Sequence, residues 1–335
     1  MILVTGGTGL VGSHLLVKLL KSQQKVRALY RSPEKIEKCK AVFQAYEESD
    51  LFDQIEWVQA DLLDYFSLKD AFEGIEYVYH SAAVVSFQSK DAHKMLDVNV
   101  EGTAHIANLC IDFSVKKLCY ISSVGALGTY PDNRCTDENA LWQKIKTTST
   151  YSISKYYAEN EVWRAGEEGL NVVIVNPATI IGFGDWTESS STIIKKVAEG
   201  LSFYPPGRNG FVGVKDVVKA ATQLMEGEVS NKRFLLVAEN LSFRKLLSKI
   251  ADELQLKQPK YKVNLVLAKM LMVLDQIRAL FTKKKAVLTR ETLHTAFKEK
   301  CFSSDRIKNE LGFEFQPMSE VIEESCRLYR EKYQL

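Results

Sequence analysis

The chain has 335 residues, of which 46% are hydrophobic and 26% are charged, the composition of an ordinary globular protein. Its formal net charge of +2 favours no polyanionic partner, and no basic run predicts binding to nucleic acid. The most apolar late stretch, at 263–274, is shorter than the roughly 20 residues that span a bilayer, so we expect no stable membrane insertion. It is predicted to be a buried or lid-forming helix, with contact to a membrane surface as the alternative.

The cysteines are scattered along the chain, and none forms a C-x-x-C pair. This spacing predicts neither a metal site nor a redox dithiol. The first residues, MILVTGG, also lack the basic and apolar segments of a secretory signal. We therefore expect reduced thiols and a cytoplasmic protein. The six cysteines are Cys39, Cys110, Cys119, Cys135, Cys301 and Cys326.

Apolar strands and amphipathic helices alternate through the first half of the chain. Strands that are apolar throughout and separated by helices predict a doubly wound parallel sheet of the α/β class, covered on both faces. Its ligand crevice is expected at the carboxyl ends of the strands. The strands are predicted at 1–7, 25–31, 55–62, 75–83, 116–123 and 171–177, and the helices at 13–22, 33–48, 68–74, 91–113 and 151–168.

Beyond about residue 178 the pattern becomes irregular. One strand candidate stands at 234–240, and helical patterns follow near 243–255, 261–281 and 318–332. We predict a dinucleotide-binding domain at 1–178 that includes the catalytic residues. The remainder, 179–335, is predicted to be a smaller mixed substrate-binding region, with the chain crossing back to the sheet near 211–240.

A glycine-rich turn follows the first strand. TGGTGLVG spaces Gly6, Gly9 and Gly12 three residues apart, between a strand and an amphipathic helix. Such a turn brings the backbone close to a pyrophosphate, and the helix N-terminus offers it free N–H groups. The turn therefore predicts a dinucleotide site that includes Thr8, Leu10 and Val11.

The end of the second strand distinguishes the two nicotinamide dinucleotides. NAD sites usually place an acidic residue there, to bind the ribose 2′-hydroxyl. No acid lies between residues 26 and 33, and Arg31 stands in that place with Ser32 and Lys35 nearby. A cation suits a 2′-phosphate, so NADP is favoured and NAD is the alternative.

The ends of the next two strands should also line the cofactor. Asp61 and Leu62 follow the third strand and are placed to meet the adenine. Ser81, Ala82 and Ala83 end the fourth strand with small side chains, which let a cofactor approach the backbone. His80, beside this groove, is more often a packing residue than an acid or base.

A serine pair ends the fifth strand, and a Y-x-x-x-K pattern opens the next helix. Ser122 and Ser123 stand at the crevice edge, and Tyr151 follows Ser123 by 28 residues. Lys155 lies one helical turn beyond Tyr151, on the same face. A lysine ammonium beside a phenol, whose reference pKa is near 10, favours its ionisation. The pattern predicts proton transfer by Tyr151.

Seven motifs in order resemble those of the extended short-chain dehydrogenase/reductases, the NAD-dependent epimerase/dehydratase family. The resemblance is firm over 1–220 and weaker at 303–317, and it implies a Rossmann fold. It implies that Ser123, rather than Ser122, is the catalytic hydroxyl. The motifs are TGGTGLVG, DLLD, HSAA, NVEGT, ISSVGALG, YSISK and NPATIIG.

The same resemblance assigns further roles near the cofactor. Lys155 should also bind the nicotinamide ribose, Asn99 is the structural asparagine position, and Pro177 and Ile180 line the nicotinamide. Ser122 and Tyr151 complete the cofactor-binding set. The family often forms homodimers through helices such as those near 92–111 and 151–167.

Three reaction classes remain open within this resemblance. Dehydratases carry an Asp–Glu pair where this chain has Val124 and Gly125, so dehydration is disfavoured. Epimerases hold NAD tightly and need cations for a substrate diphosphate, for which Arg208 and Arg290 are candidates. A reductase of the dihydroflavonol-reductase or hydroxysteroid-dehydrogenase type, acting on a bulky or apolar carbonyl compound, is favoured. A catalytically silent dinucleotide-binding protein is the least favoured reading, because both Tyr151 and Lys155 are present.

Several apolar residues of the second half are candidates for the substrate pocket or a lid over it. Each of them taken alone is more often a core residue. They are Phe183, Trp186, Phe203, Tyr204, Leu267 and Met270.

Overall fold

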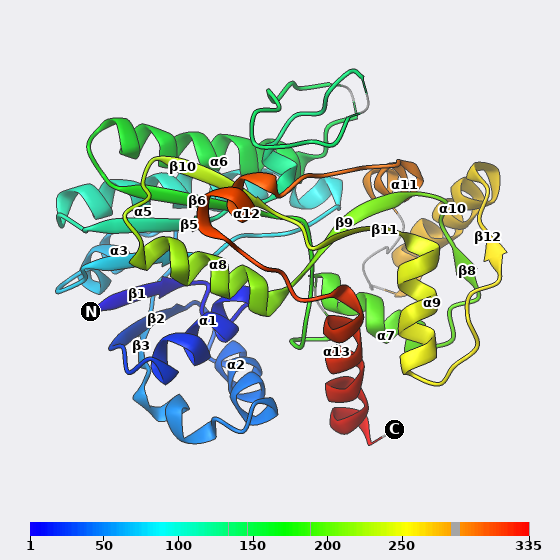
Figure 1. Cartoon of the computed structure of the whole chain (residues 1–335), viewed down its shortest axis with the longest axis horizontal. Coiled ribbons are helices and arrows are strands. Elements are labelled where there is room, and N and C mark those ends of the chain that lie inside the picture. The colour runs from blue at the N-terminus through cyan, green and yellow to red at the C-terminus, as the bar shows by residue number, and fades with distance from the viewer. Residues whose placement is uncertain (133, 146, 188, 283–288, 335) are drawn as a thin grey trace.

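A seven-stranded sheet, parallel throughout, forms the centre of this computed structural model (Figure 1). The structure describes every residue except 133, 146, 188, 283–288 and 335. The strand order is β10-β6-β5-β4-β1-β2-β3, so the order reverses between β1 and β4, where doubly wound sheets bind their ligands. The expected fold class is confirmed. The strands are β1 Ile2–Thr5, β2 Val26–Tyr30, β3 Glu56–Gln59, β4 Tyr77–His80, β5 Lys117–Ile121, β6 Val172–Pro177 and β10 Lys232–Leu236.

The central strands are largely apolar because their side chains pack into two cores, whereas β3 (EWVQ), at the edge of the sheet, has an exposed polar residue at each end. In β1, Leu3 belongs to one buried cluster and its neighbour Val4 to the other. In β6, Val172 and Val173 divide in the same way. Successive side chains of a strand point to opposite faces, so a sheet covered on both sides needs no polar face.

Helices cover both faces of this sheet, with α5 and α6 on one side and α1 and α8 on the other (Figure 1). Four of the helices, α7, α8, α11 and α12, were not expected from the sequence. The helices are α1 Leu10–Lys21, α2 Glu34–Ala45, α3 Tyr65–Ala71, α4 Ala92–Leu96, α5 Gly102–Asp112, α6 Thr150–Glu167, α7 Thr192–Ala198, α8 Val214–Glu226, α9 Phe243–Glu253, α10 Leu265–Thr282, α11 Arg290–Phe297, α12 Asp305–Leu311 and α13 Met318–Tyr333.

The predicted long helix at 91–113 is interrupted in the structure. A turn of π-helix at Asp97–Glu101 separates α4 from α5. Wider π-turns occur often at functional sites. This one carries Asn99, whose side chain points into the molecule and is 1% exposed.

The second half of the chain forms two small sheets beside the large one. β9 (Arg208–Gly213) pairs in parallel with β7 (Thr179–Ile181) and antiparallel with β11 (Glu239–Ser242). β8 (Phe203–Tyr204) pairs with β12 (Tyr261–Lys262) at the end of the molecule farthest from the large sheet (Figure 1). None of the described helices is long and apolar enough to cross a membrane.

The expectation that all six cysteines are reduced is wrong for two of them. Cys135 and Cys301 form a disulfide, with their Cα atoms 4.5 Å apart and a sequence separation of 166. Thr136 and Phe302, which directly follow the two cysteines in sequence, form a parallel β-bridge that brings the two segments together. Sequence spacing could not reveal the pair, because long-range pairing of two irregular segments creates it.

Candidate active site

The turn between β1 and α1 requires glycine because its backbone packs closely on itself and on the end of β4. Gly6 has φ +68°, and a Cβ there would lie 2.6 Å from the Ala82 nitrogen. At Gly12 a Cβ would lie 2.1 Å from the Gly6 carbonyl oxygen. Gly9, which precedes α1, has no side-chain acceptor, and the first turn of α1 contains no acid. The backbone therefore leaves a helix N-terminus suited to a phosphate group. Thr8, Leu10 and Val11 stand in this turn and at the start of α1.

The end of β4 lies against this turn. Ser81 Oγ donates a hydrogen bond to the Thr5 carbonyl oxygen (2.7 Å), and the Ala82 nitrogen donates to Thr5 Oγ1 (3.3 Å). Ala83 follows and is exposed. The small residues that end β4 therefore border the glycine turn, as a cofactor groove requires.

His80 is enclosed between β1 and α5. Its Nδ1 is hydrogen-bonded to Thr5 Oγ1 (2.6 Å) and its Nε2 to Thr103 Oγ1 (2.9 Å). Burial, and to a smaller extent the charge of Lys155, lowers the pKa of His80 to about 3. The ring is therefore neutral and structural, and it is no candidate acid or base.

The ends of β2 and β3 place the residues expected at the adenosine half of the cofactor. Arg31 directly follows β2 and is exposed, and its carbonyl oxygen accepts a hydrogen bond from Gln59 Nε2 (3.3 Å). After β3, Asp61 Oδ1 accepts from the Leu63 nitrogen (3.1 Å), and Leu62 is half-buried. All of them stand at the carboxyl edge of the sheet.

Ser123 and Tyr151 meet at the same edge. Ser123 follows β5, and its Oγ accepts a hydrogen bond from the Gly125 nitrogen (3.1 Å). Tyr151 lies in the first turn of α6, and burial of its phenol raises the pKa. A hydrogen bond with Ser123 acts in the opposite direction. The sequence predicted that Lys155 would lower the pKa of the Tyr151 phenol. In the structure the pKa is raised instead, because burial has the largest effect on it.

Lys155 lies one turn after Tyr151 and is 1% exposed. Its Nζ donates to Tyr120 Oη (2.6 Å) and to the Ile121 carbonyl oxygen (2.8 Å), so it points to the end of β5. Burial lowers the pKa of Lys155 to about 7, and the charge of Glu159 works against this effect. The lysine can therefore change its charge near neutral pH.

Glu159, one turn beyond Lys155, connects the ends of several strands. Its Oε2 accepts from Ser122 Oγ (2.6 Å) and Asn176 Nδ2 (2.8 Å), and its Oε1 accepts from Arg233 Nη1 of β10 (3.0 Å). Asn176 Nδ2 also donates to the Ser123 carbonyl oxygen (3.1 Å). The carboxylate thus holds the backbone beside Ser123. Sequence reasoning missed Glu159, although the regular spacing of Tyr151, Lys155 and Glu159 signals one helix face.

Asn99 joins three segments around the site. Its Nδ2 donates to the Val84 carbonyl oxygen and to Ser154 Oγ (both 2.9 Å), and its Oδ1 accepts from the Val84 nitrogen (2.7 Å). It therefore fixes the segment after β4 relative to the helix that carries Tyr151 and Lys155. Sequence analysis placed Asn99 near the site but could not reveal these partners.

Two residues missed in the sequence adjoin Tyr151. Phe87 lies edge-on to the Tyr151 ring, with centroids 6.2 Å apart. Glu291 of α11 accepts a hydrogen bond from the Thr150 nitrogen (3.2 Å), which brings the C-terminal region to the start of the helix that carries Tyr151. The other oxygen of Glu291 is enclosed without a hydrogen-bond partner among the described residues, and burial raises its pKa.

The residues expected around the nicotinamide and the substrate do not all lie in one place: some are in strands near the site, some are in the core and one is exposed. Pro177 ends β6 and Ile180 is central in β7, both close in sequence to the site. Phe183 and Trp186 pack edge to face with centroids 5.5 Å apart and are 4% and 1% exposed, so they belong to the core. Met270 is exposed on α10.

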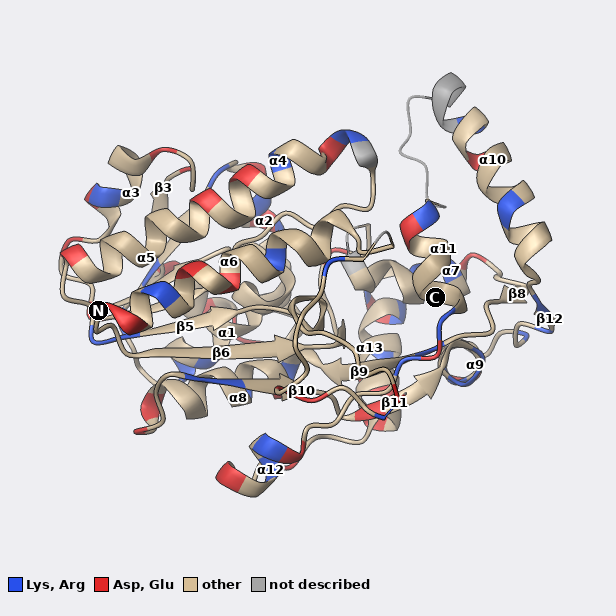
Figure 2. Ribbon diagram, turned by 90° about the horizontal axis from the view of Figure 1, so that it is seen from above, with Lys and Arg blue, Asp and Glu red and all other residues tan. Residues whose placement is uncertain are grey.

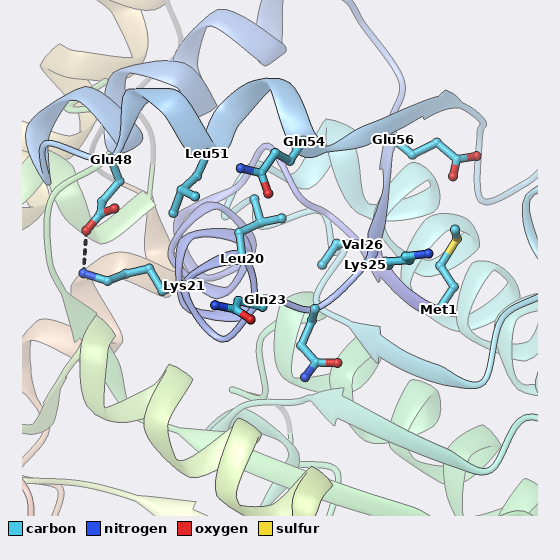
Figure 3. Close-up of a pocket in the computed structure, with 11 residues that line it drawn as sticks. Met1, Leu20, Lys21, Gln23, Lys25, Val26, Glu48, Leu51, Gln54 and Glu56 are labelled. Carbon is cyan, nitrogen blue, oxygen red and sulfur yellow. Dashed lines mark hydrogen bonds and ion pairs between the residues drawn. The ribbon is translucent and has the colours of Figure 1, made fainter.

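A surface cleft on another part of the sheet is separate from this site. Met1, Val26 and Glu56, which stand at or beside the amino ends of β1, β2 and β3, contribute to its lining, and an ion pair between Lys21 and Glu48 lies at its side (Figure 3). The cleft is thus at the opposite ends of the strands from Ser123. None of the residues described above for the candidate active site lines this cleft.

Comparisons with known proteins show the family and the fold to which this chain is similar. The model of the NAD-dependent epimerase/dehydratase family matches residues 2–236. Sterol demethylase protein B of Methylococcus capsulatus is 31% identical, with 73% of this chain and 72% of that protein covered. Anthocyanidin reductase of Arabidopsis thaliana is also 31% identical, with coverages of 78% and 81%. The structure of UDP-glucose 4-epimerase from Thermotoga maritima superposes with a TM-score of 0.77 at 19% identity over 99% of both chains, a likeness of fold.

Proposed function

Because the chain belongs to the NAD-dependent epimerase/dehydratase family, we propose that it is an NADPH-dependent reductase of a carbonyl group on a bulky or apolar molecule. The observation that carries this proposal is the meeting of Ser123 and Tyr151 at the carboxyl edge of the sheet, with Lys155 one turn away. The names of the sequence relatives, a reductase of a polycyclic anthocyanidin and a sterol-processing protein, support a substrate of this class.

The protein's own groups account for the proton half of the reaction. A nicotinamide dinucleotide bound at the glycine turn supplies the hydride that the carbonyl carbon accepts. Tyr151 donates its phenolic proton to the carbonyl oxygen, so that C=O becomes CH–OH. Ser123 donates a hydrogen bond to the same oxygen, and the ammonium of Lys155 stabilises the phenolate that Tyr151 leaves.

The preference for NADPH rests on the end of β2. Arg31 is exposed directly after the strand, and the sequence between residues 26 and 33 holds no acid that would bind a ribose 2′-hydroxyl. A guanidinium in this place suits a 2′-phosphate, because it can bind phosphate oxygens in pairs.

Sugar-nucleotide epimerisation is the second candidate. It is favoured by the position of Arg208, which is exposed on β9, and of Arg290, which opens α11. The Gly207 nitrogen donates to the Ala296 carbonyl oxygen (3.0 Å), so the strand that carries Arg208 adjoins the C-terminal end of the helix that Arg290 opens. Dehydration is disfavoured, because the turn after Ser123 begins with Val124 and Gly125 and contains no acid.

The cofactor separates these two candidates. Mass spectrometry of the nucleotide released from the purified protein identifies the bound cofactor. Titration with NADPH and NADH then measures whether the cofactor exchanges and which of the two binds more tightly. A reductase should bind exchangeable NADPH more tightly than NADH. Recovery of stoichiometric NAD that dialysis does not remove would contradict the reductase and favour the epimerase.

A further inference from the structure

Helix α10 presents an apolar stripe to the solvent. Val266, Met270, Val273 and Ile277 are 71%, 59%, 49% and 46% exposed. Their spacing of four, three and four residues places them on one face of the helix. Figure 2 shows α10 standing out from the rest of the molecule.

The opposite face of α10 is the one that packs on the protein. Ala268 is 2% exposed, and the Asp275 side chain is 14% exposed. Asp275 interacts electrostatically with Lys196 of α7 and raises its pKa, although burial lowers that pKa more strongly. The exposed stripe therefore points away from the body of the protein. A helix that is apolar on both faces is normally buried on both, and no described residue covers this stripe.

The surroundings of the stripe are cationic. Residues 256–278 contain five Lys or Arg and one Asp, a net charge of +4, whereas the whole chain has +2, so the rest of the chain is net negative. Asp275 is itself paired with Arg278 at 2.7 Å. The cationic side chains are all exposed; they are Lys257, Lys260, Lys262, Lys269 and Arg278.

An exposed aromatic pair stands at the start of this helix. Phe203 of β8 and Tyr261 of β12 are 42% and 61% exposed, with ring centroids 5.6 Å apart. The Val263 nitrogen donates to the Tyr204 carbonyl oxygen (2.9 Å), which ties α10 to these two strands. Aromatic rings are favoured at the level of lipid headgroups.

We propose that α10 and the adjoining β8–β12 pair form a surface that docks on an anionic phospholipid bilayer. The apolar stripe enters the boundary between headgroups and acyl chains, and the flanking cations meet the lipid phosphates. Docking is peripheral, since no described helix can cross the bilayer. A two-fold contact between copies through this face is disfavoured, because it would bring the cationic patches together. This surface is independent of the proposed reductase activity.

Sedimentation with lipid vesicles tests the proposal on the full chain. Vesicles of phosphatidylcholine mixed with phosphatidylglycerol should bind the protein at least about tenfold more tightly than pure phosphatidylcholine vesicles, because each cation near an anionic surface adds attraction. Binding should weaken as salt is raised. A failure to sediment with the anionic vesicles at low salt would overturn the proposal.

A variant of the stripe separates docking from charge alone. The double variant Val266→Glu, Val273→Glu places two acids on exposed positions, where the folded state tolerates them, and vesicle binding should fall at least about tenfold. Phe66→Glu is the matched control, since Phe66 is a 78% exposed residue on α3, outside the proposed surface. Unchanged melting by circular dichroism would show that both variants fold.

Two further outcomes would contradict the proposal. Equal vesicle binding by the stripe variant and the native protein would mean that the stripe does not enter the lipid. A native dimer that the stripe variant converts to a monomer, seen by analytical ultracentrifugation in the absence of lipid, would identify the surface as an interface between copies of this chain.

Discussion

At the scale of single residues, Glu159 links Lys155 to the ends of β5 and β6. It accepts hydrogen bonds from Ser122 and Asn176, is 1% exposed, and raises the pKa of Lys155 against the effect of burial. It touches no reacting atom in the proposed mechanism. Glu159 is therefore a positioning residue, and its effect should appear in the pH dependence of the reaction.

The activity of the native protein should fall as the pH rises above about 7. The pKa of Lys155 is lowered to about 7, so the ammonium that stabilises the Tyr151 phenolate is present below this pH and lost above it. The pH profile of kcat/KM for carbonyl reduction reports this group in the free enzyme. A profile that is flat between pH 6 and about 9 would contradict the assignment.

Glu159→Gln should move that decline to lower pH. The carboxylate raises the pKa of Lys155, so its neutral replacement lets burial lower the pKa further. Glu161→Gln is the control, because Glu161 is partly exposed and pairs with Arg164 at 2.9 Å. Identical pH profiles for Glu159→Gln and Glu161→Gln would show that Glu159 does not act through Lys155.

Arg31→Asp should change the cofactor preference. The substitution removes the cation at the end of β2 and places a carboxylate where it can bind a ribose 2′-hydroxyl. The ratio of affinities for NADPH and NADH should fall about tenfold or more, equivalent to ~1.4 kcal/mol, in calorimetric titrations. Lys25→Asp, at the amino end of the same strand, should leave the ratio unchanged. Equal or tighter NADPH binding by Arg31→Asp would disprove the role of Arg31.

At the scale of elements, the sequence predicts the helices and strands that have a clear local pattern of apolar and polar residues. The first six strands of the sheet were expected because each is a short apolar run between amphipathic helices. β7 was missed because it has only three residues, and β9 because glycines interrupt its apolar pattern; pairing between distant segments creates both strands. The π-turn at Asp97–Glu101 interrupts the helical pattern over only five residues, so sequence alone could not locate it.

The site shows the same division. The Gly6, Tyr151 and Lys155 positions were predictable because short motifs carry them. Glu291 was not, because its place beside Thr150 depends on how α11 packs against α6. The disulfide partners Cys135 and Cys301 were unpredictable for the same reason.

Asn99→Ala tests the connection between the π-turn and α6. The substitution leaves the Val84 backbone groups and the Ser154 hydroxyl without their buried partner, so the free energy of unfolding should fall by about 2–4 kcal/mol. Urea denaturation measures this loss. Asn171→Ala, which removes one exposed hydrogen bond to the Lys116 carbonyl oxygen, is the control and should cost less than about 1 kcal/mol. Equal losses for the two variants would contradict a special structural role of Asn99.

At the scale of the whole molecule, the disulfide joins the segment between β5 and α6 to the segment before α12. The disulfide closes a long loop, because its cysteines have a sequence separation of 166. The β-bridge between Thr136 and Phe302 joins the same two segments independently of the disulfide. Its removal should therefore leave the fold intact and act mainly on the unfolded chain.

Cys135→Ser should lower the free energy of unfolding by up to about 5 kcal/mol, the entropy of closing so long a loop. Urea denaturation of the variant and of the native protein with reductant should give the same midpoint. Titration of thiols in the denatured native protein should find four groups, the free cysteines, and not six. Six titratable thiols without added reductant would contradict the disulfide.

The central claim is that Tyr151 supplies the proton for reduction of a bulky carbonyl compound. Its most direct test is the rate of NADPH oxidation by the native protein and by Tyr151→Phe, on a panel of polycyclic and aryl ketones and aldehydes. We expect turnover by the native protein, and a loss of about 10²–10⁴-fold in kcat for Tyr151→Phe with NADPH affinity nearly unchanged. Equal turnover by the two proteins on the same substrate would contradict it.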